Sequence, residues 1–565
     1  MDMKVVIVGG VAGGATAAAR LRRINESAEI IVFERGGYVS YANCGLPYYI
    51  GGDITDKRAL TLQTTGSFKA RFNVDVRVHS EVTAIDTSAK TVAVRETETG
   101  REYTESYDKL LLSPGAKPTV PDVPGIDNER IFTLRTVEDT FRMKDYIAAA
   151  GVKRAVIIGG GFIGLEMAEC LTEAGAAVTL LQRSEHVMPN LDFDMASFVH
   201  GYMRSKGIDL RRNTPVDRYE AIENGVRVVT RNGGSIDTDM VLLAIGVTPD
   251  TALAAKAGIK LASKGAIAVN DRMETSVKDV YAVGDAVEIV NPITGAPAVI
   301  PLAGPANKQG RIAADNINGG DRHYKGTIGA AVMKLFDMTV AHAGLSEKAA
   351  KAAGIDYDYA VTYSPNHATY YPGASNMTLK VLFERATGRV IGAQIVGFDG
   401  VDKRIDTLAE AMRLGLTAYD LTELEFAYAP PYSSAKDPVN MIGYVIENVV
   451  SGRVKQYHWD EAAALDRDKV QIVDVRTPRE FSHGCIPGAV NIPVDDMRER
   501  MGELDKSKPV YLNCQVGLRS YIAYCILAQN GFDCYNLAGG YRYWESAATE
   551  SSFSVAPCHP CGMEI

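Results

Sequence analysis

The fold of the first part of the chain is decided by the stretch Lys4-Val-Val-Ile-Val8-Gly9-Gly-Val-Ala-Gly-Gly14. The apolar run at 4–8 is typical of a buried parallel strand, and the glycines after it permit a tight turn into a helix over 15–23. A second strand, 29–33, ends at an acid that can accept hydrogen bonds from a ribose. These features predict a dinucleotide site with a pyrophosphate at the helix N-terminus. The candidate contacts are Gly9, Val11, Ala12, Gly13, Gly14 and Glu34.

The same pattern returns over residues 155–183. A strand, a glycine turn, a helix and a second strand follow one another, but this strand ends at Gln182 and Arg183 and not at an acid. A cation without a carboxylate at this corner can accept a 2′-phosphate, which favours NADPH over NADH. The alternative is that Arg183 is only a solvated surface charge. The candidate contacts are Gly159, Gly161, Phe162, Ile163, Gly164, Glu166, Gln182 and Arg183.

The second nucleotide unit is inserted within the first. A buried strand ends in a turn at Gly115, and residues 241–249, with Gly246, close the second unit. Residues 280–285 then return to the first nucleotide and place Asp285 near its ribityl or phosphate oxygens. Two nested nucleotide sites imply a flavin that takes hydride from a nicotinamide, NADPH or NADH. We therefore predict FAD in the first site and NAD(P)H in the second.

A single cysteine follows the first strand-helix-strand unit, in Ser40-Tyr-Ala-Asn-Cys44-Gly-Leu-Pro-Tyr-Tyr49. In a doubly wound fold this position returns to the ligand crevice. Disulfide reductases that carry an internal pair place the second cysteine five residues on, and here that position is Tyr49. Cys44 is thus expected to work alone, through a mixed disulfide with a small thiol or a sulfenic acid. The alternative is a buried structural cysteine.

The composition is that of a multidomain globular protein and argues against nucleic-acid binding, a disulfide scaffold and a membrane span. A chain of 565 residues should hold several domains, and its net charge of −9 gives no reason to expect nucleic-acid binding. Eight cysteines are too sparse for a disulfide scaffold and indicate a reducing compartment. The first strand leaves no room for a signal peptide, and no apolar run reaches membrane-spanning length. We expect a cytoplasmic protein without a membrane partner.

Residues 326–450 change to an α+β pattern without a cofactor motif. Two tyrosine-rich turns, around Tyr370 and Tyr428, suggest an interface that completes a site. Residues 1–450 resemble the coenzyme A disulfide reductases of the flavoprotein disulfide reductase superfamily, on the nested fingerprints, their glycine spacing and Ser40-x-x-Asn43-Cys44-x-Leu46-Pro47-Tyr48.

The resemblance implies a homodimer in which Tyr370 and Tyr428 reach the partner's Cys44 region. It also implies bound coenzyme A (CoA). The residues that match or lie near CoA-holding positions are Thr16, Arg20, Arg23, Ser40, Asn43, Arg71 and Lys436, and Asn307 stands where a histidine is often found.

A different domain follows residue 455. Two strand patterns, at 471–476 and 509–513, precede Cys514-Gln-Val-Gly-Leu-Arg519-Ser520 and a helix through 527. A cysteine at a strand-to-helix turn faces backbone N–H groups and the positive end of the helix dipole, which stabilise a thiolate. This segment resembles a rhodanese domain.

The loop length separates two chemistries. Arg519 follows Cys514 by five residues, whereas phosphatases of related shape place their arginine at six, and the tighter loop suits a terminal persulfide sulfur. Phosphate hydrolysis is the alternative. Cys485, Cys525 and Cys534 have no such context and are expected to be structural. In the tail, Cys558 and Cys561 favour a reversible disulfide or no function over a metal site, and we expect no metal elsewhere.

We therefore predict an α/β chain with two nested Rossmann-like dinucleotide-binding domains, an α+β dimerisation domain and an α/β rhodanese domain. The expected boundaries are 1–118 and 248–325 for FAD, 119–247 for NAD(P), 326–450 for dimerisation, 455–550 for rhodanese and 551–565 for a flexible tail.

The predicted activity is NAD(P)H-dependent reduction of CoA disulfide, CoA persulfide or polysulfide. Cys44 is the redox cysteine, Tyr428 and Tyr370 protonate the leaving sulfur, and Cys514 with Arg519 handles sulfane sulfur. The rhodanese pattern favours persulfide or polysulfide, because it adds nothing to CoA disulfide reduction. One alternative is an NADH oxidase or peroxidase, although those relatives commonly carry a histidine where Val11 and Ala12 stand. The other is a non-enzymatic redox sensor or sulfur carrier.

Overall fold

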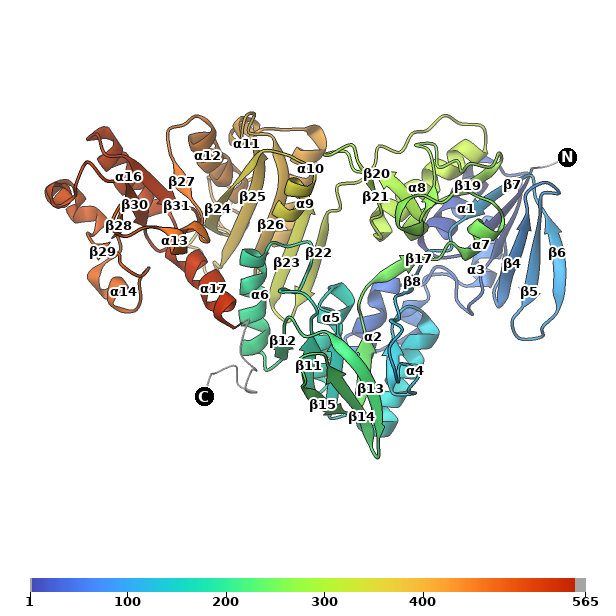
Figure 1. The fold of residues 1–565 in the computed structure, drawn as a ribbon. Coiled ribbons are helices and arrows are strands. Elements are labelled where there is room, and N and C mark those ends of the chain that lie inside the picture. Colours follow the sequence, from blue (N-terminus) through green and yellow to red (C-terminus); the bar gives the residue numbers. More distant parts are fainter. Residues whose placement is uncertain (1–2, 554–565) are drawn as a thin grey trace. The chain divides into compact units, whose positions relative to one another are not determined.

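The computed structural model describes residues 3–553, which form two compact units. Within this part of the chain, the first unit holds residues 3–183 and 214–329, and the second holds 184–213 and 330–553. The chain therefore passes from one unit to the other three times (Figure 1). Of the predicted tail, 551–565, the first two residues belong to a helix that ends at Ser552, whereas Cys558 and Cys561 lie outside the described residues. The individual domain boundaries stay predictions.

The first sheet of the first unit is parallel and carries the first glycine loop. Its strand order is β19-β7-β1-β2-β3. The bounds are β1 Lys4–Val8, β2 Glu29–Phe33, β3 Asp75–Arg77, β7 Lys109–Leu112 and β19 Val280–Ala282. Helix α1 (Ala12–Ile24) begins three residues before the predicted start, because Gly13 and Gly14 belong to its first turn. It packs against α8 (Ala303–Ile317). A three-stranded antiparallel sheet, β4 Ser80–Asp86, β5 Thr91–Glu96 and β6 Glu102–Ser106, follows β3 in the chain.

The second sheet repeats this arrangement. Its strands in the first unit run in the order β11-β10-β16-β9 and are all parallel. The bounds are β9 Ile131–Thr133, β10 Arg154–Ile158, β11 Ala177–Leu181 and β16 Met240–Leu243, with α4 Val137–Ala150 and α5 Phe162–Glu173 as helices. An antiparallel sheet is formed by β13 Val216–Ile222, β14 Gly225–Thr230 and β15 Ser235–Thr238.

The two sheets are joined by a pair of short strands, β8 (Ala116–Pro118) and β17 (Val247–Pro249), which run antiparallel. The chain leaves the first sheet through β8 and returns through β17, so the second nucleotide unit is inserted at this pair. The nested arrangement predicted from the two glycine loops is confirmed.

The second unit contains an antiparallel sheet of order β22-β23-β26-β25-β24. The bounds are β22 Ala331–Leu335, β23 Met338–Gly344, β24 Tyr357–Pro365, β25 Asn376–Glu384 and β26 Val390–Gly397. Its helices include α6 Phe193–Ser205, α10 Val401–Leu414, α11 Ala418–Glu423 and α12 Pro438–Val450. Every residue of β26 is buried, because helices cover this sheet. The predicted α+β class is confirmed.

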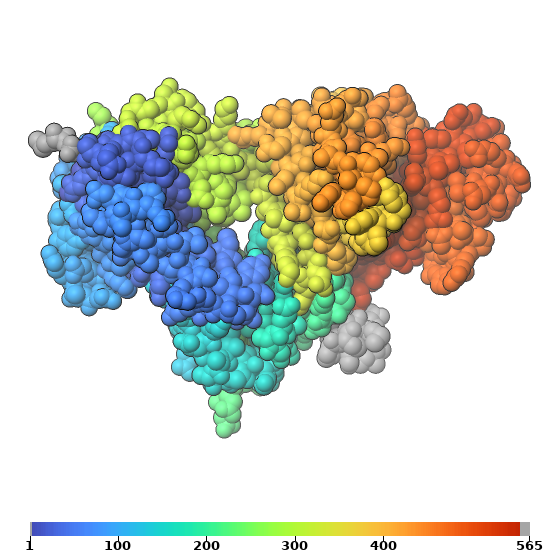
Figure 2. All heavy atoms as spheres, turned by 180° about the vertical axis from the view of Figure 1, so that it is seen from behind, coloured from blue at the N-terminus to red at the C-terminus, as the bar shows by residue number. Residues whose placement is uncertain are grey.

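The last domain has a parallel sheet of order β27-β31-β30-β28-β29. The bounds are β27 Gln456–Tyr457, β28 Gln471–Asp474, β29 Val490–Asn491, β30 Val510–Asn513 and β31 Cys534–Leu537, with α14 Pro478–Ser482, α15 Met497–Arg500, α16 Leu518–Gln529 and α17 Gly540–Ser552 as helices. Figure 2 shows this domain in red beside the orange residues that precede it in the second unit. Cys514 follows β30 directly, as predicted.

Candidate active site

Each nucleotide loop begins with a glycine that the backbone geometry requires. Gly9 has a φ of +96°, and a Cβ on it would lie 2.1 Å from the carbonyl oxygen of Ser113. Gly159 has a φ of +105°, and its Cβ would lie 2.4 Å from the carbonyl oxygen of Ala244. A side chain is excluded by both the backbone conformation and the close approach. Each loop can therefore pass tightly against the neighbouring strand, which is the cradle that a pyrophosphate needs.

The residue after the second strand of each unit holds the glycine loop. Glu34 Oε2 accepts a hydrogen bond from the backbone N–H of Gly10 at 2.9 Å. Gln182 Oε1 accepts one from the N–H of Gly160, also at 2.9 Å. Both residues therefore lie at the corner predicted for ribose recognition, charged in the first site and neutral in the second. Arg183, beside Gln182, is exposed.

The other predicted cofactor contacts lie on the same loops and strand ends. Val11 caps α1, Ala12 opens it, and Gly161 caps α5, which Phe162, Ile163 and Gly164 begin. Gly115 lies just before β8, where its Cβ would be 2.9 Å from Nη2 of Arg135, and Gly246 lies just before β17.

Arg135 is a site residue that the sequence did not predict. Its Nη2 lies 3.9 Å from Oδ2 of Asp285, and its Nε donates to the carbonyl of Ala116. Its buried Nη1 has no hydrogen-bond partner among the described residues, which fits a cofactor oxygen. Burial raises the pKa of Asp285, and the charge of Arg135 opposes this. The only sequence signal for Arg135 is its place just after strand β9.

These residues fit the cofactor expected in the first site. The Gly9 loop offers a pyrophosphate cradle, while Glu34, Asp285 and the open N–H of Arg135 supply polar contacts. When bound, FAD passes two electrons between a nicotinamide and a sulfur group.

Cys44 lies in a short 3-10 turn, Asn43–Gly45, which leads directly into α2 (Leu46–Gly51). Partial burial raises the pKa of its thiol, the charges of Glu166 and Asp285 add to this, and Arg135 opposes them. The protein charges by themselves favour the thiol, so the predicted thiolate requires stabilisation from a further partner.

Glu166 connects the second nucleotide unit to this cysteine. Helix α2 packs on α5 so closely that a Cβ on Gly51 would lie 2.7 Å from Sγ of Cys170. Burial and the charge of Glu169 raise the pKa of Glu166 to about 7, while a hydrogen bond with Tyr48 lowers it. The predicted nucleotide contact is therefore also a group that titrates near neutral pH within electrostatic reach of the thiol.

The predicted CoA residues are partly brought together. Thr16 Oγ1 donates to Oδ1 of Asn307 at 2.7 Å, and Arg20 Nε lies 2.6 Å from Oδ1 of Asp315. Both contacts join α1 to α8. The other candidates are distributed over several elements: Arg23 is exposed at the end of α1, Arg71 is exposed on α3 (Thr65–Phe72), Ser40 and Asn43 precede Cys44, and Lys436 is exposed in the second unit. Part of the charge of Arg20 is thus already neutralised by Asp315.

The two predicted tyrosines meet on the surface of the second unit. The hydroxyl oxygens of Tyr370 and Tyr428 lie 2.7 Å apart, and the side chains are 74% and 46% exposed. The hydrogen bond with Tyr428 raises the pKa of Tyr370. A pair of exposed phenols is a ready proton donor for a group that docks there.

A buried arginine, which the sequence did not predict, holds the two tyrosine turns together. Arg404, from α10, donates through Nη2 to the carbonyl oxygen of Asn366 at 2.9 Å and to Oγ of Ser433 at 3.1 Å. The same atom lies 3.0 Å from Oδ2 of Asp437, which is also buried. Asn366 belongs to the first turn and Ser433 to the second, so one guanidinium fixes both.

The cysteine of the last domain lies in a hydrogen-bonded loop. Sγ of Cys514 is fully buried and accepts from the N–H of Gly517 at 3.2 Å and from Oγ of Ser520 at 3.4 Å. Arg519 makes two hydrogen bonds to the carboxylate of Glu480, at 2.8 and 2.6 Å. Of the several backbone N–H groups predicted to face Cys514, one, that of Gly517, donates to the sulfur, with the Ser520 hydroxyl beside it, and Arg519 is bound to Glu480.

One acidic cluster among the described residues has metal-like spacing, Asp192, Asp194 and Glu347. Its centre is filled by Nζ of Lys380, which lies 3.1, 2.7 and 2.6 Å from the three carboxylates. The cluster is thus already neutralised by a cation of the chain. Separately, within residues 3–553 no helix is both long and apolar enough to cross a bilayer.

The fold and the two cysteine sites define a class of protein. The family described as "Pyridine nucleotide-disulphide oxidoreductase" matches residues 3–310, and its dimerisation domain matches 330–438. A "Rhodanese-like domain" matches 460–547. The chain belongs to the pyridine nucleotide-disulphide oxidoreductase family, and it is an FAD-dependent oxidoreductase that uses NAD(P)H.

Particular relatives narrow this class. A coenzyme A disulfide reductase of Staphylococcus aureus (strain JH9) is 38% identical over 442 residues, which cover 78% of this chain and 99% of that protein. The structure of reduced Bacillus anthracis CoADR-RHD is 47% identical with a TM-score of 0.96, covering 97% and 99% of the two chains. An NAD-dependent persulfide reductase from A. fulgidus is 39% identical with a TM-score of 0.90, covering 96% and 100%. The predicted resemblance is confirmed.

Proposed function

We propose that this chain reduces a CoA disulfide, CoA persulfide or polysulfide with NAD(P)H, using Cys44 as its single redox cysteine. The observation that carries the proposal is the pairing of two different cysteine sites in one chain. Cys44 precedes α2 in the nucleotide unit, and Cys514 lies in a donor-lined loop. The relatives named as CoA disulfide reductase and persulfide reductase support this combination.

The sulfur chemistry balances with these residues. The Cys44 thiolate attacks one sulfur of a CoA disulfide, a new S–S bond forms, and the old one breaks with its electron pair on the departing CoA sulfur. A proton from Tyr428 or Tyr370 neutralises this thiolate. Two electrons from NAD(P)H then break the S–S bond of the mixed disulfide, which restores the Cys44 thiolate and releases the second CoA as a thiol after it takes up a proton.

We further propose a homodimer in which the Tyr370–Tyr428 pair of one subunit serves the Cys44 site of the other. The dimerisation domain at 330–438 and the exposure of both phenols support this arrangement. Thr16, Arg20, Asn307 and the other predicted residues hold CoA, and the sparse cysteines favour work in the cytoplasm.

The test is a comparison of steady-state rates with CoA disulfide, CoA persulfide, hydrogen peroxide and oxygen, each with NADH and with NADPH. We expect the sulfur substrates to be preferred. Cys44→Ser should keep its bound FAD absorbance and lose all sulfur reduction, whereas the matched control Cys525→Ser, on α16 outside both sites, should keep it. Retained CoA persulfide reduction in Cys44→Ser would contradict the mechanism. Faster turnover of oxygen or peroxide would favour an oxidase, since a water-forming NADH oxidase from Lactobacillus brevis shares the fold at 28% identity and a TM-score of 0.76.

A further inference from the structure

Arg519, the arginine of the Cys514 loop, forms an ion pair with Glu480. Arg519 Nη1 donates to Oε2 of Glu480 and Nη2 donates to Oε1, at 2.8 and 2.6 Å. This is the bidentate geometry that gives the strongest arginine–carboxylate pairs. The side chains of Arg519 and Glu480 are about one-third exposed, at 32% and 33%, so solvent and a small molecule can reach the pair.

Glu480 is also fixed from its own side. It is the third residue of α14 and forms a capping box with Thr477. The backbone N–H and the hydroxyl of Thr477 both donate to Oε2 of Glu480, at 3.0 and 2.8 Å. The pKa of Glu480 is lowered to about 2, mainly by its hydrogen bonds with Arg519. The carboxylate is therefore charged and held in place at neutral pH.

The second arginine beside the loop is neutralised in the same way. Arg476 makes hydrogen bonds to Asp474 from Nε and Nη2, at 2.7 to 3.0 Å, and both residues are buried. Its Nη1 donates to the side-chain oxygen of Gln515 in the loop. The charges of two arginines and two carboxylates near Cys514 thus neutralise one another. The sulfur is stabilised by the N–H of Gly517 and the hydroxyl of Ser520.

We propose that Glu480 is a specificity-determining residue that makes this loop accept sulfur from thiol-borne persulfides and reject thiosulfate. The proposal rests on the sulfur-transfer role assigned to Cys514 above. Thiosulfate carries two negative charges and releases sulfite, another dianion, so it requires a free cation near the thiolate. A persulfide carries at most one charge on the transferred sulfur and releases a thiolate that is easily protonated.

The transfer is balanced for the preferred donor. The Cys514 thiolate attacks the terminal sulfur of R–S–SH, the new S–S bond forms, and the old bond breaks with its electron pair on the R–S sulfur. The products are Cys514–S–SH and R–S⁻, so no outside oxidant or reductant is needed. Glu480 touches neither sulfur. It acts by occupying Arg519, as a positioning residue.

The decisive variant is Glu480→Gln, because glutamine also completes a capping box and only the charge is removed. With thiosulfate as donor and cyanide as acceptor, we expect kcat/KM to rise about tenfold or more, mainly through a lower KM, since one charge-assisted contact becomes available. With glutathione persulfide as donor, we expect a change of less than about threefold, because that donor needs no free cation. Glu480→Asp, which keeps the charge, should still discriminate against thiosulfate.

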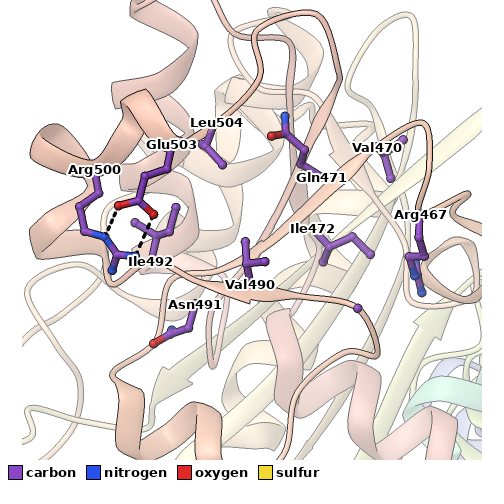
Figure 3. Close-up of a pocket in the computed structure, with 11 residues that line it drawn as sticks. Arg467, Val470, Gln471, Ile472, Val490, Asn491, Ile492, Arg500, Glu503 and Leu504 are labelled. Atoms are coloured by element: carbon purple, nitrogen blue, oxygen red, sulfur yellow. Dashed lines mark hydrogen bonds and ion pairs between the residues drawn. The ribbon is translucent and has the colours of Figure 1, made fainter.

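The matched control is Glu503→Gln in the same domain. Glu503 pairs with Arg500 at 2.7 Å in the wall of a pocket of about 330 Å³, shown in Figure 3, which none of residues 514–520 lines. The Glu503→Gln substitution should leave kcat/KM unchanged with both sulfur donors. Equal use of both donors by the unchanged chain, or no selective gain in Glu480→Gln with an unchanged melting temperature, would overturn the proposal. The Cys514→Ser variant distinguishes the sulfur-transfer role of Cys514 from the specificity role of Glu480. If sulfur transfer survives in this variant, the role of Cys514 is refuted, whatever the effect of Glu480→Gln.

Discussion

Glu34 and Gln182 stand at equivalent corners of the two nucleotide units and differ by one charge. Each accepts a hydrogen bond from its own glycine loop at 2.9 Å. A carboxylate at this corner repels a 2′-phosphate, whereas the amide of Gln182 does not. The second site therefore tolerates an anion, and exposed Arg183 is the adjacent cation that can bind it.

We expect NADPH to be used at least as well as NADH. Arg183→Ala should raise the KM for NADPH by about tenfold to a hundredfold and leave that for NADH little changed, because one charge-assisted phosphate contact contributes roughly 1.5–3 kcal/mol. Arg231→Ala, at an exposed arginine in the turn after β14, serves as the control. Equal effects of Arg183→Ala on both nucleotides would mean that Arg183 does not contact the phosphate.

A second prediction at the residue scale concerns Glu166. Its negative charge raises the pKa of the Cys44 thiol, so Glu166→Gln should lower that pKa. The measurement is the pH dependence of Cys44 alkylation by iodoacetamide, whose midpoint should move to lower pH. Glu173→Gln, exposed near the end of the same helix, should leave the midpoint in place. A midpoint unchanged in both variants would show that the two groups are not coupled.

At the scale of elements, the tyrosine turns depend on a contact from a helix. Arg404 of α10 bonds to both turns and pairs with buried Asp437. An exposed pair of phenols keeps its geometry only while its supporting loops are fixed. The turns are therefore built by α10 as much as by their own residues.

Arg404→Met should destabilise the protein by about 3 kcal/mol or more, because it leaves Asp437 buried and unpaired. Turnover with CoA disulfide should fall as the Tyr370–Tyr428 pair loses its support. The double variant Arg404→Met/Asp437→Asn should recover much of the melting temperature, since no lone charge remains, but not the turnover. Full activity in the double variant would mean that the turns do not require this bridge.

At the scale of the molecule, the second unit is assembled from segments far apart in the chain. Glu550 of α17 accepts from Arg204 at 2.6 and 2.9 Å, and Oε1 of Glu550 lies 2.8 Å from Nε of Arg212 and 3.0 Å from Nδ1 of His200. His200 accepts a hydrogen bond at Nε2 from Val187, which leaves a proton on Nδ1 for Glu550. This buried cluster fastens the rhodanese domain to α6.

The cluster predicts a loss of stability in acid. Burial lowers the pKa of His200 from 6.5 to about 4, so its unfolded form binds a proton first, and stability falls as pH drops from about 6.5 to 4. The pKa of Glu550 is lowered from 4.5 to about 2, so the contribution of Glu550 to stability is lost as the pH falls from about 4.5 to 2. Melting temperatures measured from pH 7 to 4 should decline less steeply in His200→Asn. An identical slope in the two proteins would rule out this histidine as the cause.

The sequence by itself determined the features that depend on neighbouring residues. Gly9 and Gly159 predict nucleotide loops, because a glycine turn between a strand and a helix is recognisable from a few consecutive positions. The hydrogen bond from the N–H of Gly517 to Cys514 follows from a strand, a short loop and a helix in direct succession. The nested order of the sheets was likewise predictable, because each glycine loop marks a strand and a helix.

Only the tertiary structure decided which charges face one another. Glu480 meets Arg519 across 39 residues, Arg404 meets Asp437 across 33, and Glu550 meets Arg204 across 346. Arg135 became a site residue because β9 ends beside Asp285. No local pattern records such pairs, since an ion pair depends on the packing of whole elements and each partner resembles an ordinary surface charge. For that reason the sequence placed Arg519 in the loop of Cys514, but only the fold showed that its partner is Glu480.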